Sequence, residues 1–183
     1  MSGYATCQTP LSAARSSDPL AFIRDFVNTL DRETGVDGLV PWLHTQGASR
    51  PRRREVVEAA RVREAMRMLL LGHNGAVVDV AAAERVLDRA ARRSGLHVRF
   101  RGSARFEPTR RGVDGVIGRI LGAVATAATE GTWARLKACR APDCAWAFVD
   151  STRNHSRRWC SMAVCGNRAK GRAYRARTRR GTR

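Results

Sequence analysis

The chain has 183 residues and a formal net charge of +18. Its length suits one domain of ordinary size and one small module. The longest apolar run, residues 113–128, is shorter than the roughly 20 residues that cross a membrane and contains Asp114 and Arg119, so we expect no transmembrane segment. The charge is uneven, because residues 1–132 carry a net +6 and residues 133–183 a net +12. This concentration at one end is typical of a nucleic-acid-binding module.

Residues 1–16 are rich in Ser, Ala and Thr and show no hydrophobic period, so we expect a disordered leader. They contain no apolar segment of the kind that defines a secretory signal peptide. A cytoplasmic location is therefore expected, where thiols stay reduced and structural disulfides are rare. Cys7 stands alone in this leader, and we expect no role for it.

Residues 17–131 show the hydrophobic spacing of a helical domain. Asp18 is predicted to cap the first helix, with Pro19 at its first position and with Leu20, Ile23 and Val27 on one apolar face. By the same spacing we expect helices near residues 39–43, 50–72, 79–94 and 114–130. The last of these has glycines on one side, which would let another element approach closely: Gly115, Gly118 and Gly122.

The period changes once within this helical domain. Residues 97–107 alternate apolar and polar side chains on either side of a Gly-Ser pair, which predicts a β-hairpin with a two-residue type II′ turn. An isolated hairpin is marginally stable, so we expect it to pack on the helices.

Four cysteines form two Cys-x4-Cys pairs separated by fifteen residues: Cys139, Cys144, Cys160 and Cys165. Two thiolate pairs across a loop are how a protein presents four sulfur ligands tetrahedrally to Zn²⁺, so the pattern predicts a closed structural zinc site. Disulfides or unliganded thiols are the alternatives. Because residues 132–183 are too few to bury an adequate core, metal binding is expected to supply folding energy there.

The zinc module is predicted to be treble-clef-like. Residues 133–138 are expected to be extended, a Pro142-Asp143 turn to return the second cysteine, and Ser161 to cap a final basic helix. A stripe of alanines, Ala169, Ala173 and Ala176, is expected to face the module, while cations face outward. Candidate nucleic-acid contacts in and before this helix are Arg157, Arg158, Asn167, Arg168, Lys170, Arg172, Arg175 and Arg179.

The stretch WCSMAVCGNRAK resembles the CGNR zinc finger, whose signature corresponds here to Cys165, Gly166, Asn167 and Arg168. The segments DFVNTL, residues 25–30, and PWL, residues 41–43, resemble the helical ABATE domain that usually precedes that finger. The resemblance implies a bacterial transcription regulator, in some cases stress-induced, with a DNA-binding finger. The fold expected overall is mainly α: a helical domain with one hairpin at 17–131, then a four-cysteine zinc finger with a basic helix at 132–183.

Two binding functions and one catalytic function can be weighed. The first is a zinc-dependent DNA-binding transcription regulator whose helical domain senses a small-molecule ligand or forms a homodimer. The second is an RNA-binding or ribosome-associated protein that uses the same charge. Catalysis is not expected, because four cysteines leave zinc no open position and His155 has no recognisable partner.

Overall fold

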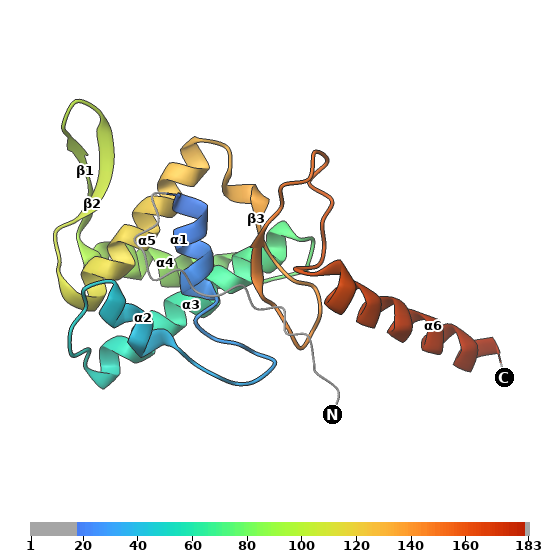
Figure 1. Cartoon of the computed structure of the whole chain (residues 1–183). Helices are drawn as coiled ribbons and strands as arrows, with labels where there is room; N and C mark the ends of the chain where they lie inside the picture. The colour runs from blue at the N-terminus through green and yellow to red at the C-terminus, as the bar shows by residue number, and fades with distance from the viewer. Residues whose placement is uncertain (1–17, 182–183) are drawn as a thin grey trace.

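A computed structural model describes residues 18–181 (Figure 1), so the leader predicted for residues 1–16 lies outside the described part. The fold is mainly helical, as predicted. The helices are α1 (Pro19–Val27), α2 (Leu39–Thr45), α3 (Arg53–His73), α4 (Val80–Ser94), α5 (Gly112–Thr129) and α6 (Asn167–Gly181). The strands are β1 (Leu96–Phe100), β2 (Ala104–Pro108), β3 (Leu136–Ala138) and β4 (Ala147–Val149).

Helices α1 to α5 form a body around one apolar core. Asp18 caps α1 as predicted, because its carboxylate accepts a hydrogen bond from the Leu20 N–H at 2.9 Å. Phe26 is fully buried, and its ring lies 5.4 Å from that of Trp42 in α2. Helices α3 and α5 complete this core with their apolar faces. The body is thus held mainly by burial of apolar surface.

The glycine side of α5 packs against the hairpin β1–β2, which confirms the prediction that these glycines let another element approach closely. A Cβ on Gly118 would lie 2.5 Å from Cβ of Pro108, and one on Gly122 would lie 3.0 Å from the carbonyl oxygen of Phe106. The turn differs from the prediction, because pairing ends at Phe100 and Ala104 and three residues close the loop. Beyond this contact the hairpin projects from the body (Figure 1).

Helix α5 is long and apolar enough, by length and composition, to cross a membrane. This was not predicted from the sequence, because the apolar run at residues 113–128 is shorter than the helix. Half of it is buried inside the protein. Ile117 and Ile120 have no exposed surface and belong to the apolar core of the body. This part of α5 therefore contributes to the core of the body.

The antiparallel pair β3–β4 is a wall shared by the body and the cysteine-rich region. Leu136 and Ala138 on β3 and Ala147 on β4 are buried in the core of the body. The next residues along each strand face the other way, since side chains alternate across a strand, and Phe148 packs with the cysteines. The extended segment predicted at 133–138 is strand only from Leu136, because Trp133–Arg135 forms a 3₁₀ turn.

Candidate zinc centre and basic helix

The four cysteines converge from separate segments of the chain. Their sulfur atoms all lie within 4.8 Å of one another, and the Cys144–Cys160 and Cys160–Cys165 pairs are 3.6 and 3.7 Å apart. Sulfurs at Zn–S distances near 2.3 Å would be separated by about 3.8 Å across a tetrahedron. A disulfide needs about 2.05 Å, so these four residues are free thiols in a metal-sized cluster.

Short local structures position three of the four cysteines. The Cys139 N–H donates to the carbonyl oxygen of Trp146 at 2.9 Å, which ties the end of β3 to the chain entering β4. The Cys144 N–H donates to the carbonyl oxygen of Ala141 at 3.0 Å, which closes the turn predicted at Pro142-Asp143. Cys165 lies in a turn of π-helix, Met162–Gly166, which Ser161 caps as predicted because its hydroxyl accepts a hydrogen bond from the Val164 N–H.

The thiols hydrogen-bond to one another and so share protons unequally. Hydrogen bonds from Cys144 and Cys160 lower the pKa of Cys139 to about 2. The hydrogen bond to Cys139 raises the pKa of Cys144 to about 12, and the same partner raises the pKa of Cys160. Without a metal ion, the cluster therefore favours one thiolate, at Cys139. Four thiolates so close together require a cation to balance their negative charge. Zn²⁺, which prefers four thiolates in structural sites, fits this donor set.

Residues 135–178 match the family model of the CGNR zinc finger. The match contains all four cysteines and the Cys-Gly-Asn-Arg signature that begins at Cys165. Zinc is therefore the metal that this cluster holds, and we call residues 135–178 the finger. No curated protein matches the chain. The resemblance of the body to the ABATE domain stays a prediction.

A buried ion pair next to the cysteines was not predicted. The Lys137 ammonium lies 2.7 Å from the Asp150 carboxylate, with the two side chains 6% and 0% exposed. Asp150 also accepts hydrogen bonds from Thr152 and from the Arg157 N–H. Burial alone would raise the pKa of Asp150, but these hydrogen bonds, with Lys137 first among them, lower it well below its ordinary value. Asp150 therefore fixes the start of the loop that leads to Cys160.

Two of the arginines predicted to contact nucleic acid use their guanidinium groups within the protein. Arg157 donates to the carbonyl oxygen of Trp159 at 2.9 Å and to that of Cys160, and its guanidinium lies over the Phe148 ring at 4.9 Å. Arg168, the arginine of the signature, lies 2.7 Å from Glu33 in the body and 3.7 Å from Asp143 in the finger. Arg168 thus ties the start of α6 to both regions.

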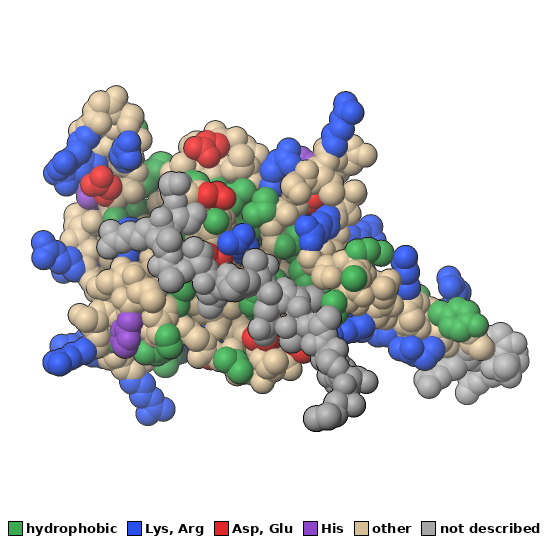
Figure 2. Space-filling view, in the orientation of Figure 1, with side chains coloured by type: hydrophobic (Ala, Val, Ile, Leu, Met, Phe, Trp, Pro, Cys, Tyr) green, Lys and Arg blue, Asp and Glu red, His purple; other side chains and the backbone are tan. Residues whose placement is uncertain are grey.

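The remaining candidates whose side chains the structure describes are exposed, as are two of the three alanines that were predicted to face the module. In Figure 1, α6 runs away from the rest of the molecule, and Figure 2 shows basic side chains along it. Ala173 and Ala176 are exposed, so the prediction that they face the module is wrong; only Ala169 is partly covered. The exposed candidates are Arg158, Asn167, Lys170, Arg172 and Arg175. The side chain of Arg179 lies outside the described part.

Polar side chains from the body hold the finger by its backbone, and sequence reasoning missed most of them. Asn28 both donates to and accepts from the backbone of Ala147, at 2.9 and 2.8 Å. Arg67, almost fully buried, donates to the Ala145 carbonyl oxygen at 2.9 Å. Asn74 donates to the carbonyl oxygens of Ala138 and Arg158. No pattern in the sequence identified the partner of Asn28, which lies 119 residues away along the chain.

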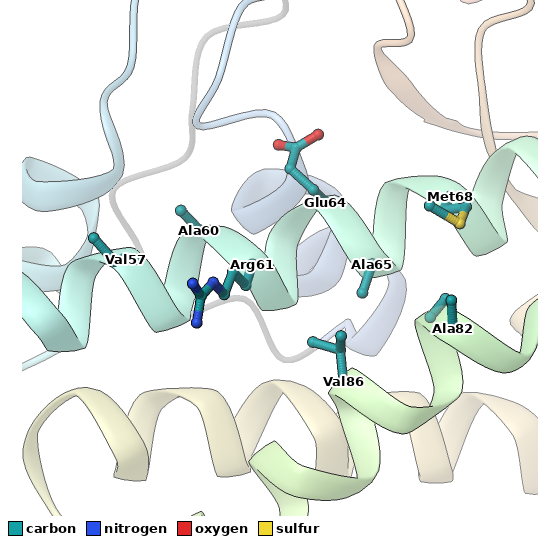
Figure 3. A pocket seen from close by; sticks show the side chains of 9 residues that line it. Val57, Ala60, Arg61, Glu64, Ala65, Met68, Ala82 and Val86 are labelled. Carbon is teal, nitrogen blue, oxygen red and sulfur yellow. The ribbon is translucent and has the colours of Figure 1, made fainter. Parts of the chain in front are cut away.

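The body also has an apolar groove between α3 and α4 (Figure 3). Its volume is about 490 Å³, and Val57, Ala65, Met68 and Val86 are among its lining residues. Glu64, on its border, accepts hydrogen bonds from Arg63 and Arg67. The groove therefore borders a residue that holds Arg67 in its contact with the finger.

Proposed function

We propose that the protein is a zinc-dependent DNA-binding transcription regulator in which α6 provides most of the contacts to the phosphate backbone. The observation that supports this proposal is the contrast among the basic residues of the finger. Arg157 and Arg168 are used inside the protein, whereas Lys170, Arg172 and Arg175 are exposed on a projecting helix. No acidic residue within 4 Å of these three cations is found between residues 18 and 181.

A row of guanidinium groups on a helix suits a duplex. Arginine donates paired hydrogen bonds to phosphate oxygens and to guanine edges, and a helix fits the major groove. Arg172 and Arg175 are one turn apart, so they project from neighbouring positions on α6. Zinc, when bound, supplies the fixed base from which this helix projects, and Arg168 orients the first turn through Glu33.

The test is binding to duplex DNA as a function of salt, using wild type and the Arg172→Gln/Arg175→Gln variant. Each phosphate contact contributes about −0.9 to the slope of log K against log salt, so the variant should bind more weakly and its slope should become shallower by about 2. The matched control is Arg53→Gln/Arg54→Gln, which removes the same charge from the exposed start of α3. Equal weakening by the two variants would show that only net charge matters.

RNA is the second candidate partner, because the same exposed cations would bind it. Competition between a duplex DNA pool and structured RNA separates the two proposals. We expect DNA to be retained when RNA is present in equal nucleotide concentration. Displacement by RNA from every duplex selected from a random pool would contradict the regulator proposal and favour the RNA-binding one.

We further infer that the body is the regulatory part, through an effector or a second copy of the chain. The supporting contacts are those of Asn28, Arg67 and Asn74, which run from the body to the backbone of the finger. Glu64 is among the residues that line the groove in Figure 3, and it accepts a hydrogen bond from Arg67 at 3.0 Å. A ligand in the groove that displaced Glu64 would loosen Arg67 and change the DNA affinity measured in the same assay.

A further inference from the structure

A second concavity, a cleft, lies where the hairpin meets α5. It has a volume of about 690 Å³, within the range of small-molecule sites. Its walls come from β2 and from one side of α5, and its apolar lining includes Phe106, Pro108, Gly122 and Ala123. Ser103 and Thr126 add hydroxyl groups. The cleft therefore offers both apolar surface and groups that can donate hydrogen bonds.

The shape of the cleft follows from the glycine side of α5. The missing side chain at Gly122 lets the backbone of Phe106 approach the helix, since even a Cβ there would lie 3.0 Å from its carbonyl oxygen. Past Phe106 the hairpin leaves the helix, and at its far end Phe100 is 81% exposed. The wedge of space between the departing strand and α5 is the cleft.

The cleft has a net positive charge. Arg105, Arg110 and Arg119 line it, and Glu107 is its one acidic lining residue. Glu107 lies 3.8 Å from Arg99, on the neighbouring strand, so its charge is partly balanced from outside the cleft. Within residues 18–181, Arg105 and Arg110 have no carboxylate within 4 Å. Arg119 is already engaged, because it donates to the Gln46 carbonyl oxygen at 2.7 Å, so Arg105 and Arg110 are the cations that face a ligand in the cleft.

We propose that this cleft binds a small organic anion, a molecule with a flat apolar body and a carboxylate, sulfonate or phosphate group. The apolar body would lie on Phe106 and Ala123, and the acidic group would be held by Arg105 and Arg110. Arginine suits this role because its planar fork pairs with two oxygens of such a group. The site is distinct from the zinc centre, from α6 and from the groove between α3 and α4, and it does not depend on the nucleic-acid proposal.

The experiment uses two fluorescent probes of the same aromatic skeleton. The anion 8-anilinonaphthalene-1-sulfonate has the chemistry proposed, and the uncharged N-phenyl-1-naphthylamine lacks its sulfonate. We expect the anion to bind the zinc-loaded full chain with one dominant site. Arg105→Gln and Arg110→Gln should each weaken that binding about two- to fivefold, the size of an exposed ion pair. Thr126→Trp, which fills the cleft without changing its charge, should abolish it.

Two controls locate the anion. Arg61→Gln changes the border of the α3–α4 groove, and Arg172→Gln changes α6; both should leave its affinity within a factor of two. Binding of the uncharged probe should be unaffected by either cleft arginine. The proposal is overturned if Arg105→Gln, Arg110→Gln and Thr126→Trp all bind the anion like wild type, or if Arg172→Gln removes the signal. Complete displacement of the anion by a short single-stranded oligonucleotide, with Arg172→Gln showing no effect, would make the cleft a nucleic-acid contact and would also overturn it.

Discussion

The body and the finger are stabilised in opposite ways, although they share a wall. The body has a large apolar cluster to which α1, α2, α3 and α5 contribute. The finger has a small cluster around its cysteines, in which Trp146 and Phe148 are the largest members, and it relies on zinc and on the Lys137–Asp150 pair. Between them, β3 and β4 give one face to each region. The composition of the chain changes near residue 132, and so does the interaction that stabilises the fold, from apolar burial in the body to metal binding in the finger. The boundary between the two packed cores lies elsewhere, between the two faces of the β3–β4 sheet.

The largest expected change in the stability of the finger relative to the body comes from removing a zinc ligand. Cys160→Ala should release residues 139–178, because structural zinc contributes on the order of 10 kcal/mol or more to the folding of such modules. The body should remain folded but less stable, since β3 and β4 would hold Leu136 and Ala147 in its core less firmly. Hydrogen exchange measured by mass spectrometry would show full loss of protection in the finger and partial loss in α1 and α3.

The matched control for that experiment is Cys7→Ala, which should leave exchange unchanged in both regions. Protection of the finger that survives Cys160→Ala would mean that the contacts from the body, and not the metal, fold it. Loss of protection throughout α5 would mean that body and finger are a single cooperative unit.

The second largest effect is expected from removing the buried Lys137–Asp150 ion pair of the finger. Asp150→Ala should destabilise the protein by about 4 kcal/mol, because the buried ammonium of Lys137 keeps only its hydrogen bond to the His155 carbonyl oxygen and loses its carboxylate, and two backbone N–H groups lose their acceptor. The control is Asp143→Ala, whose exposed carboxylate should matter by less than about 0.5 kcal/mol. Urea unfolding followed by tryptophan fluorescence measures both changes.

The effect of Asp150 should also depend on pH. Because the folded protein holds the pKa of Asp150 below its ordinary value of 3.8, the ionised carboxylate stabilises the fold fully above that value. The contribution is lost as the pH falls below 3.8 toward the lowered pKa. The difference in unfolding free energy between wild type and Asp150→Ala should therefore shrink only in this acid range. A difference that already shrank between pH 7 and 5 would contradict the assignment.

The third effect tests the connection between the two regions. Asn28→Ala should cost about 2–3 kcal/mol, because it leaves the buried N–H and C=O of Ala147 without partners. The matched control, Asn154→Ala in the exposed loop of the finger, should change stability by less than about 0.5 kcal/mol. Unfolding that stays a single transition with a lower midpoint would confirm a shared unit. Separation into two transitions would show that Asn28 is what joins them.

The sequence predicted features that rest on local spacing. The cap at Asp18, the α5 glycines and the convergence of the four cysteines all follow from residues near one another in the chain, or from a recognisable motif. Features that depend on a distant partner could not be predicted. Asn28 and Arg67 read as an ordinary helix end and a surface arginine until β4 is seen beside them.

The basic helix shows the same limit for charge. A count of arginines cannot tell those that hold the protein together from those that face solvent. Arg157 and Arg168 belong to the first kind because Phe148, Glu33 and Asp143 lie within reach in three dimensions. The alanines of α6 did not indicate correctly which face of the helix is buried, because alanine is accommodated on an exposed helix face as well as at a close helix contact.

The hydrogen bonds that join α1 to β4 also set an order for folding during synthesis. The helical hairpin α3–α4 involves neighbours in the chain and can form as soon as it leaves the ribosome. Asn28, by contrast, must wait until Ala147 emerges, 119 residues later. The core that covers Leu136 and Ala147 is then completed only after both strands have been made. A ribosome stalled before residue 147 would therefore carry a body whose first helix still lacks its partner, and protease sensitivity of α1 in such nascent chains would reveal it.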